Sequence, residues 1–172
     1  MRTTRVTAMC VTLWAAVACS ASAQGVLPDN LHVDPMLKPM LTWLWSRSPT
    51  FRRQCLRIGD AANLTVRVAL TTSSPGRNSD ALTVVGRDRS GRLIRAEISV
   101  VEPLSRRRRL ELVAHELEHV VEQLDDLDLA SLQRRGVSGV YSTGDHHFET
   151  ARAAAIGRLV IREADEAQGP SS

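Results

Sequence analysis

Two histidines lie four residues apart in the segment ELVAHELEHVVEQL, residues 111–124, and a glutamate directly follows the first of them. On a helix, His115 and His119 lie on adjacent turns, so both imidazoles can point to one spot. Neutral imidazole nitrogens are good zinc ligands, and Glu116 is turned to the side where it can reach a metal-bound water. The spacing therefore predicts a zinc site with an adjacent general base.

The helix that carries these residues is predicted from a cap at Ser105 to Leu124. Both histidines lie nearly opposite its apolar arc, so they are not core histidines satisfied by one hydrogen bond. Their face also carries Glu111, Glu118 and Glu122, as a solvated face would. A solvated face without metal is therefore the alternative to the zinc site. The apolar arc consists of Leu110, Val113, Leu117, Val120, Val121 and Leu124.

A third protein ligand is required, because two histidines alone do not hold zinc tightly. The segment HHFETARAAAIGRLVI predicts a C-terminal helix with a cap at Asp145 that ends near Ala164. Glu149 would lie on an apolar face of its first turn, where the helix dipole favours an ionised carboxylate. A carboxylate on an apolar face is unfavourable unless it is paired or metal-bound. We therefore predict Glu149 as the third ligand, with support of the helix N-terminus or an ion pair to Arg152 as the alternative.

The rest of the chain supplies the elements that must position these residues. Helical patterns at 34–45 and 48–58 are followed by alternating patterns that predict strands at 63–71, 81–87 and 92–101. Short links between the strands predict an α+β fold, in which a small, mostly antiparallel sheet packs against the motif helix and the C-terminal helix. No linker divides residues 24–172, so we expect a single domain.

The first 23 residues predict a secretory signal peptide, because Arg2 and Arg5 precede an apolar run that ends at a small-residue cleavage site after Ala23. The run is too short to span a bilayer permanently. We therefore expect an exported chain, periplasmic or extracellular, that begins at Gln24 and has no stable membrane span. Lipid modification of Cys19 after signal removal is the alternative.

Charge and cysteine content narrow the function classes. Removing residues 1–23 lowers the formal net charge from +3 to +1, since it removes two arginines and no acid. Aromatic residues make up 3% of the chain and its longest basic run, 106–109, leads into an acidic helix, so nucleic acid is not an expected partner. Of the three cysteines only Cys55 would remain in the exported chain, and its helical pattern predicts a small buried hydrophobe.

His115, Glu116 and His119 resemble the active-site motif of the zincin metallopeptidases, and Glu149 on a second helix resembles the gluzincin branch. The resemblance covers roughly residues 90–165. It implies a zincin-like fold in which His115, His119 and Glu149 bind zinc, and Glu116 is the general base and proton shuttle. It also implies that the strand at 92–101 forms the sheet edge along which an extended peptide lies.

The chain departs from the gluzincin pattern at Ala153, where many members carry an aspartate that orients a ligand histidine. Three acids after the motif helix are candidates for that orienting role: Asp125, Asp126 and Asp128. The segment STGDHH also offers alternative third ligands, as in other zincin branches: Asp145, His146 and His147. Peptide deformylases share the His-Glu motif, but their cysteine ligand has no counterpart here, because Cys55 lies in a helical segment.

We therefore expect a secreted zinc-dependent peptidase, in which zinc activates a water and polarises the scissile carbonyl while Glu116 moves the proton. Tyr141, His146 and His147 are candidates to stabilise the tetrahedral intermediate. The alternative function is a non-catalytic, zinc-stabilised binding module, in which a fourth protein ligand would close the site.

Overall fold

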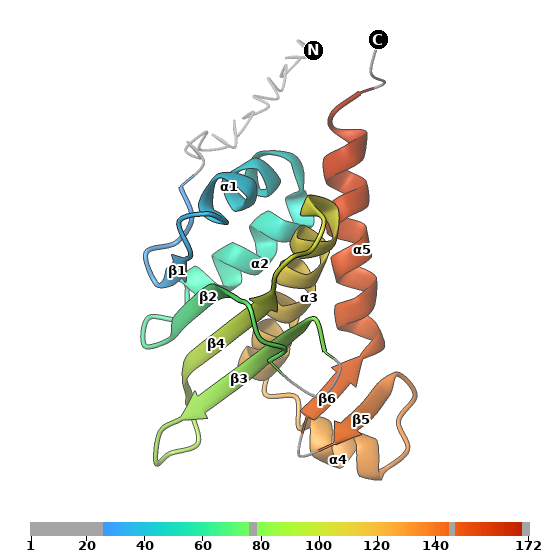
Figure 1. The fold of residues 1–172 in the computed structure, drawn as a ribbon. Helices are drawn as coiled ribbons and strands as arrows, with labels where there is room; N and C mark the ends of the chain where they lie inside the picture. The colour runs from blue at the N-terminus through green and yellow to red at the C-terminus, as the bar shows by residue number, and fades with distance from the viewer. Residues whose placement is uncertain (1–25, 76–78, 145–146, 170–172) are drawn as a thin grey trace, which may run out of the picture.

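The computed structural model describes residues 26–75, 79–144 and 147–169 (Figure 1). The expected signal peptide, its cleavage site and Cys19 lie outside these ranges, as do Asp145 and His146. Within the described ranges, no helix combines the length and the apolar composition that a bilayer span requires.

The described chain forms an α+β fold with a four-stranded sheet and a separate two-stranded hairpin. The strands are β1 (Leu31–Val33), β2 (Thr65–Thr71), β3 (Ala81–Arg87), β4 (Leu93–Val101), β5 (Val140–Gly144) and β6 (His147–Thr150). The helices are α1 (Lys38–Arg47), α2 (Pro49–Gly59), α3 (Arg106–Leu124), α4 (Leu129–Arg134) and α5 (Ala151–Glu166).

The four-stranded sheet is mixed, so the prediction of a mostly antiparallel sheet is wrong. In the strand order β1-β2-β4-β3, β2 pairs in parallel with both β1 and β4, and β3 pairs antiparallel with β4. Parallel neighbours need a long crossover, which α1 and α2 supply between β1 and β2. Strand β3 follows β2 in the sequence but is not its neighbour in the sheet, because β4 lies between them. The predicted edge strand at 92–101 is therefore interior, and β3 is the described strand at that edge.

Helix α3 lies at the centre of the fold and contacts β3, β4, α2 and α5 (Figure 1). It begins after Ser105, whose hydroxyl accepts a hydrogen bond from Arg108 N at 3.3 Å, so the predicted cap is confirmed. The face opposite the apolar arc is not solvated, because Glu118, His119 and Glu122 are 4%, 8% and 1% exposed. Helix α5 and the end of β6 cover that face, and the periodicity of α3 alone contains no information about them.

Helix α5 begins at Ala151, so the predicted start at Asp145 is wrong. Its N-cap is Thr150, whose Oγ1 accepts a hydrogen bond from Ala153 N at 2.9 Å. The preceding residues pair in the β5–β6 hairpin, where Tyr141 lies opposite Glu149. Glu149 therefore lies on a strand, and the prediction that it lies in the first turn of a helix is wrong.

The N-terminal helices pack into the core beside the sheet. Helix α2 begins at Pro49, next to the predicted start at 48, and Ser48 caps it. Helix α1 begins at Lys38, later than the predicted start at 34. Cys55 of α2 is fully buried, and burial raises the pKa of its thiol. The prediction of a small buried residue at this position is confirmed.

Helix α5 holds the first turn of α2 through Glu163. Its carboxylate accepts hydrogen bonds from Ser48 Oγ at 2.6 Å, from Thr50 N at 3.0 Å and from Thr50 Oγ1 at 2.7 Å. Burial acts to raise the pKa of Glu163, but these hydrogen bonds outweigh it, so the pKa lies below its usual value of 4.5.

We expect Glu163→Gln to lower the free energy of unfolding by about 1 kcal/mol at pH 7. A carboxylate whose pKa is lower in the folded state stabilises the fold above its unfolded pKa, and this stabilisation is lost as the pH falls through the folded pKa. The difference from the wild type should therefore shrink below about pH 4.5. Urea unfolding at pH 7 and pH 3 measures the difference in free energy of unfolding between Glu163→Gln and the wild type, with Glu166→Gln at an exposed position as the control. An equal difference at both pH values would contradict the assignment.

Candidate metal centre

Three predicted ligands from two segments of the chain converge. His115 and His119 come from adjacent turns of α3, and Glu149 comes from β6. The His115 Nε2 atom lies 3.1 Å from His119 Nε2 and 2.8 Å from Glu149 Oε2, and the distance from His119 Nε2 to Glu149 Oε2 is 3.7 Å. The hairpin, which the sequence did not predict, is the element that brings the carboxylate to the histidines.

These distances fit the donor set of a small divalent cation. Ligands at about 2.0–2.1 Å in a tetrahedron around zinc lie about 3.3 Å from one another. The three observed separations bracket that value, and the imidazole rings meet edge to face with an interplanar angle of 78°. The group could therefore hold a metal ion without rearrangement of α3.

The ring of His119 is oriented by Glu122, which would be exposed to water under the alternative of a solvated face. The distance from His119 Nδ1 to Glu122 Oε2 is 2.8 Å, and Thr150 Oγ1 donates to Glu122 Oε1 at 2.7 Å. In the neutral form of His119, a proton on Nδ1 leaves the Nε2 lone pair directed toward His115 and Glu149. The spacing of three residues from His119 to Glu122 could have indicated this contact.

Charge at the donors is balanced within the group. Hydrogen bonds from His115 and then His119 lower the pKa of Glu149 to about 2. Burial acts to lower the pKa of His119, but hydrogen bonds to Glu122 and Glu149 outweigh it and raise the pKa to about 10. A protonated His119 thus faces the anion Glu149, and a bound cation would take the place of the proton on Nε2.

Glu116 lies beside the donors but is not one of them. It is buried on α3, and its Oε2 accepts a hydrogen bond from Thr83 Oγ1 of β3 at 2.6 Å. Burial raises the pKa of Glu116, and the Thr83 hydrogen bond opposes this only in part. Thr83 could not be identified from the sequence, because its position next to Glu116 depends on the packing of β3 against α3.

An open cleft of about 350 Å³ adjoins the donors. Its walls include His115, Glu116 and Glu149, together with Arg108 of α3 and Arg158 of α5.

Comparison of the chain with family models, with curated proteins and with solved structures found no match. The resemblance to zincins therefore rests on the motif residues.

The candidates to stabilise the tetrahedral intermediate, and the alternative third ligands, come from β5, β6 and the residues between them. Asp145, His146 and the side chain of His147 lie outside the described part of the chain, so their suggested roles stay predictions. Tyr141 is 60% exposed and lies opposite Glu149 in the hairpin, on the same side of the strand pair.

The three aspartates proposed to orient a histidine do not do so. Asp125 pairs with Arg57 at 3.5 Å and with Arg152 at 3.2 Å, and Asp128 caps α4. Asp126 occupies a turn with a φ of 53°. All three follow the end of α3, whereas Glu122 lies one turn from His119 inside the helix.

Helix α5 approaches α3 closely at Gly157. A Cβ atom at this position would lie 2.9 Å from the Glu111 backbone oxygen and 3.2 Å from His115 Cβ. Neither neighbour is the flexible end of a side chain, so any larger residue must push the two helices apart. The lack of a side chain at Gly157 therefore helps to fix where His115 lies relative to Glu149.

We expect Gly157→Ala to destabilise the protein by about 1–3 kcal/mol through overpacking. Alanine is favoured over glycine by about 1 kcal/mol inside a helix, so a net loss would report the close approach. Denaturant unfolding measures the effect, and zinc affinity should fall with it. The control is Gly86→Ala, where the nearest atom to the added Cβ would be Arg95 Cβ at 3.6 Å. A variant as stable as the wild type would show that α5 can move without disturbing the site.

Proposed function

We propose that this protein is a zinc-dependent peptidase. The observation that carries the proposal is the convergence of His115 Nε2, His119 Nε2 and Glu149 Oε2 beside the carboxylate of Glu116. Zinc bound by these donors would supply a Lewis acid that polarises the scissile carbonyl and lowers the pKa of a water.

In this proposal Glu116 is the general base. The hydrogen bond from Thr83 holds Oε2 of the carboxylate and leaves Oε1 to take a proton from the attacking water. The same group then donates that proton to the leaving amine. The burial of Glu116 limits competition from bulk solvent for this proton.

The free edge of β3 is the proposed support for an extended substrate. Among the described strands, β3 pairs only with β4, so its other edge presents unpaired backbone groups. Thr83, which contacts Glu116, lies on this strand. A peptide added to the edge would form backbone hydrogen bonds beside the general base, a recognition mode that does not depend on the substrate's sequence.

The open cleft favours catalysis over the alternative of a closed, structural zinc site. The described residues offer three donors, and the side chain of Glu149 is 42% exposed. Catalytic zinc sites keep a position free for water or substrate, whereas structural sites take four protein ligands.

The experiment that tests the proposal combines metal content with zinc-dependent hydrolysis. We expect about one zinc per purified chain, cleavage of a mixed peptide pool detected by mass spectrometry, loss of cleavage with a chelator and recovery when zinc is returned. Bound zinc without any cleavage would favour the binding module. If the protein neither binds zinc nor cleaves peptides, the His-Glu motif occurs here by chance and the proposal is wrong.

A further inference from the structure

The cleft beside the donors contains an arginine without a partner in the described chain. Arg108 and Arg158 both line this cleft. Arg108 pairs with Asp80 at 3.3 Å and with Glu111 at 3.4 Å. Arg158 is exposed, and among the described residues no hydrogen bond or ion pair involves it. Its charge is thus left available in the cleft.

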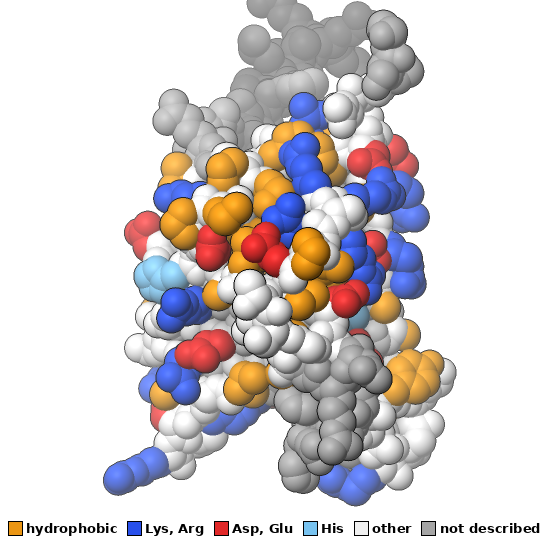
Figure 2. All heavy atoms as spheres, in the orientation of Figure 1, with side chains coloured by type: hydrophobic (Ala, Val, Ile, Leu, Met, Phe, Trp, Pro, Cys, Tyr) orange, Lys and Arg blue, Asp and Glu red, His pale blue; other side chains and the backbone are white. Residues whose placement is uncertain are grey.

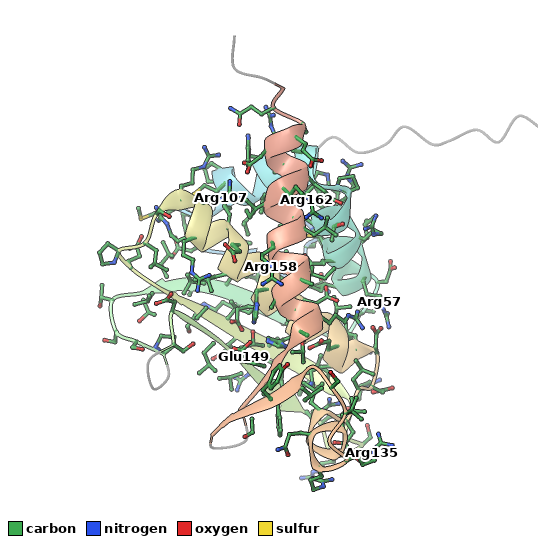
Figure 3. All side chains as sticks on the ribbon, turned by 90° about the vertical axis from the view of Figure 1, so that its right-hand side faces the viewer. Arg57, Arg107, Arg135, Glu149, Arg158 and Arg162 are labelled. Atoms are coloured by element: carbon green, nitrogen blue, oxygen red, sulfur yellow. The ribbon has the colours of Figure 1, made fainter. Side chains whose placement is uncertain are left out.

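The position of Arg158 follows from the packing of α5. It directly follows Gly157, where α5 comes closest to His115. It also lies one turn after Ala154, and both residues line the cleft. Figure 3 shows Arg158 on α5 between Arg162 and the level of Glu149. In Figure 2, basic side chains gather along the side of the molecule that α5 occupies.

The chemistry of this arginine selects its ligand. A guanidinium stays charged at every working pH and offers parallel N–H donors that match the two oxygens of a carboxylate. The four acids that line the same cleft already have partners: Asp80 and Glu111 pair with Arg108, Glu116 accepts from Thr83, and Glu149 faces His115. We propose that Arg158 binds a carboxylate of the substrate, so the substrate class is peptides with a free C-terminal carboxylate or an acidic side chain. This inference rests on the proposed peptidase function.

The direction of the substrate decides which carboxylate reaches Arg158. Asp80 and Ala81, at the start of β3, line the same cleft. A peptide that pairs antiparallel with β3 brings its C-terminal part to this end, and hence its terminal carboxylate to Arg158. A peptide that pairs in parallel brings an N-terminal part there, and only an acidic side chain could then meet the guanidinium.

Three peptides that differ only in their carboxylates test the inference. One has a free C-terminus, one a C-terminal amide, and one a C-terminal amide with a glutamate near the scissile bond. We expect Arg158→Ala to lower kcat/KM of the zinc-loaded protein about tenfold or more for one carboxylate peptide and to leave the neutral peptide unchanged. The peptide that responds identifies the source of the carboxylate. The control variant is Arg162→Ala, at an exposed position one turn further along α5, and it should leave kcat/KM unchanged for all three peptides.

Binding separates failure of this inference from failure of the proposed function. Fluorescence anisotropy of labelled peptides is measured with zinc-loaded Glu116→Gln protein, with and without Arg158→Ala. If the wild type cleaves no peptide but carboxylate-dependent binding is lost with Arg158→Ala, the carboxylate site stands and the peptidase proposal falls. Equal binding of acidic and neutral peptides, or a preference that survives Arg158→Ala, would overturn the carboxylate site.

Discussion

Replacing Glu116 by glutamine is expected to reduce turnover by the zinc-loaded protein about 10²- to 10⁴-fold, the range typical of general acid–base catalysis. The amide keeps the shape of the carboxylate and can still accept the hydrogen bond from Thr83, but it cannot take a proton from water. Zinc content should not change, because Glu116 is not one of the three donors. Turnover and zinc stoichiometry measured on one sample check both parts.

The matched control for this variant is Glu111→Gln. Glu111 lies on the same helix and lines the same cleft, but its carboxylate faces Arg108 at 3.4 Å. Its turnover should stay within a few-fold of the wild type. If Glu116→Gln kept wild-type turnover, the general base would have to be another group.

Zinc affinity is expected to fall far more in Glu149→Ala and His119→Ala than in a variant that keeps the donors. Loss of a partner that only orients a ligand typically weakens metal binding 10- to 100-fold, and loss of a ligand should exceed that. Glu122→Gln supplies the comparison, because Glu122 touches His119 Nδ1 and not the donor atoms. Isothermal titration with zinc measures the order of the three affinities.

Thermal unfolding gives a second measurement of the same effect. A ligand that binds only the folded state raises its stability in proportion to RT ln(1 + [L]/Kd). Zinc should therefore raise the unfolding temperature of the wild type and of Glu111→Gln, and raise that of Glu149→Ala little. An equal rise in wild type and Glu149→Ala would exclude this carboxylate as a ligand.

The parts of the fold that depend on local sequence were predictable. The motif helix begins after Ser105 and ends at Leu124 as the cap and periodicity predicted. Helix α2 spans Pro49–Gly59, within one residue of the helical pattern at 48–58. The strand at 81–87 was also predicted, and the strands at 65–71 and 93–101 follow from alternating hydrophobicity. Their order does not, because the choice between β2 and β4 as the neighbour of β3 depends on contacts distant in sequence.

In the candidate site, too, the features that depend on local sequence were predictable and those that depend on distant segments were not. The i, i+4 spacing of His115 and His119 was enough to predict that their rings meet. Glu149 was identified through a helix that does not include it, and it reaches the histidines because β5 pairs with β6. Thr83 was missed because its contact with Glu116 depends on the packing of β3 against α3. The contact of Glu122 with His119 lies within α3, and their spacing of three residues could have indicated it.

Three buried carboxylates of α3 are each bonded to a different part of the molecule. The bonded pairs are Thr83–Glu116, Gln54–Glu118, Arg152–Glu118 and Thr150–Glu122. Rotating α3 about its axis, or sliding it by one residue, would leave at least one of these acids without a partner in the interior, which costs more than the loss of an apolar contact. These acids, which are not metal donors, therefore fix the rotation of α3 about its axis and with it the direction in which both imidazoles point. The two histidines need no metal to be held in place.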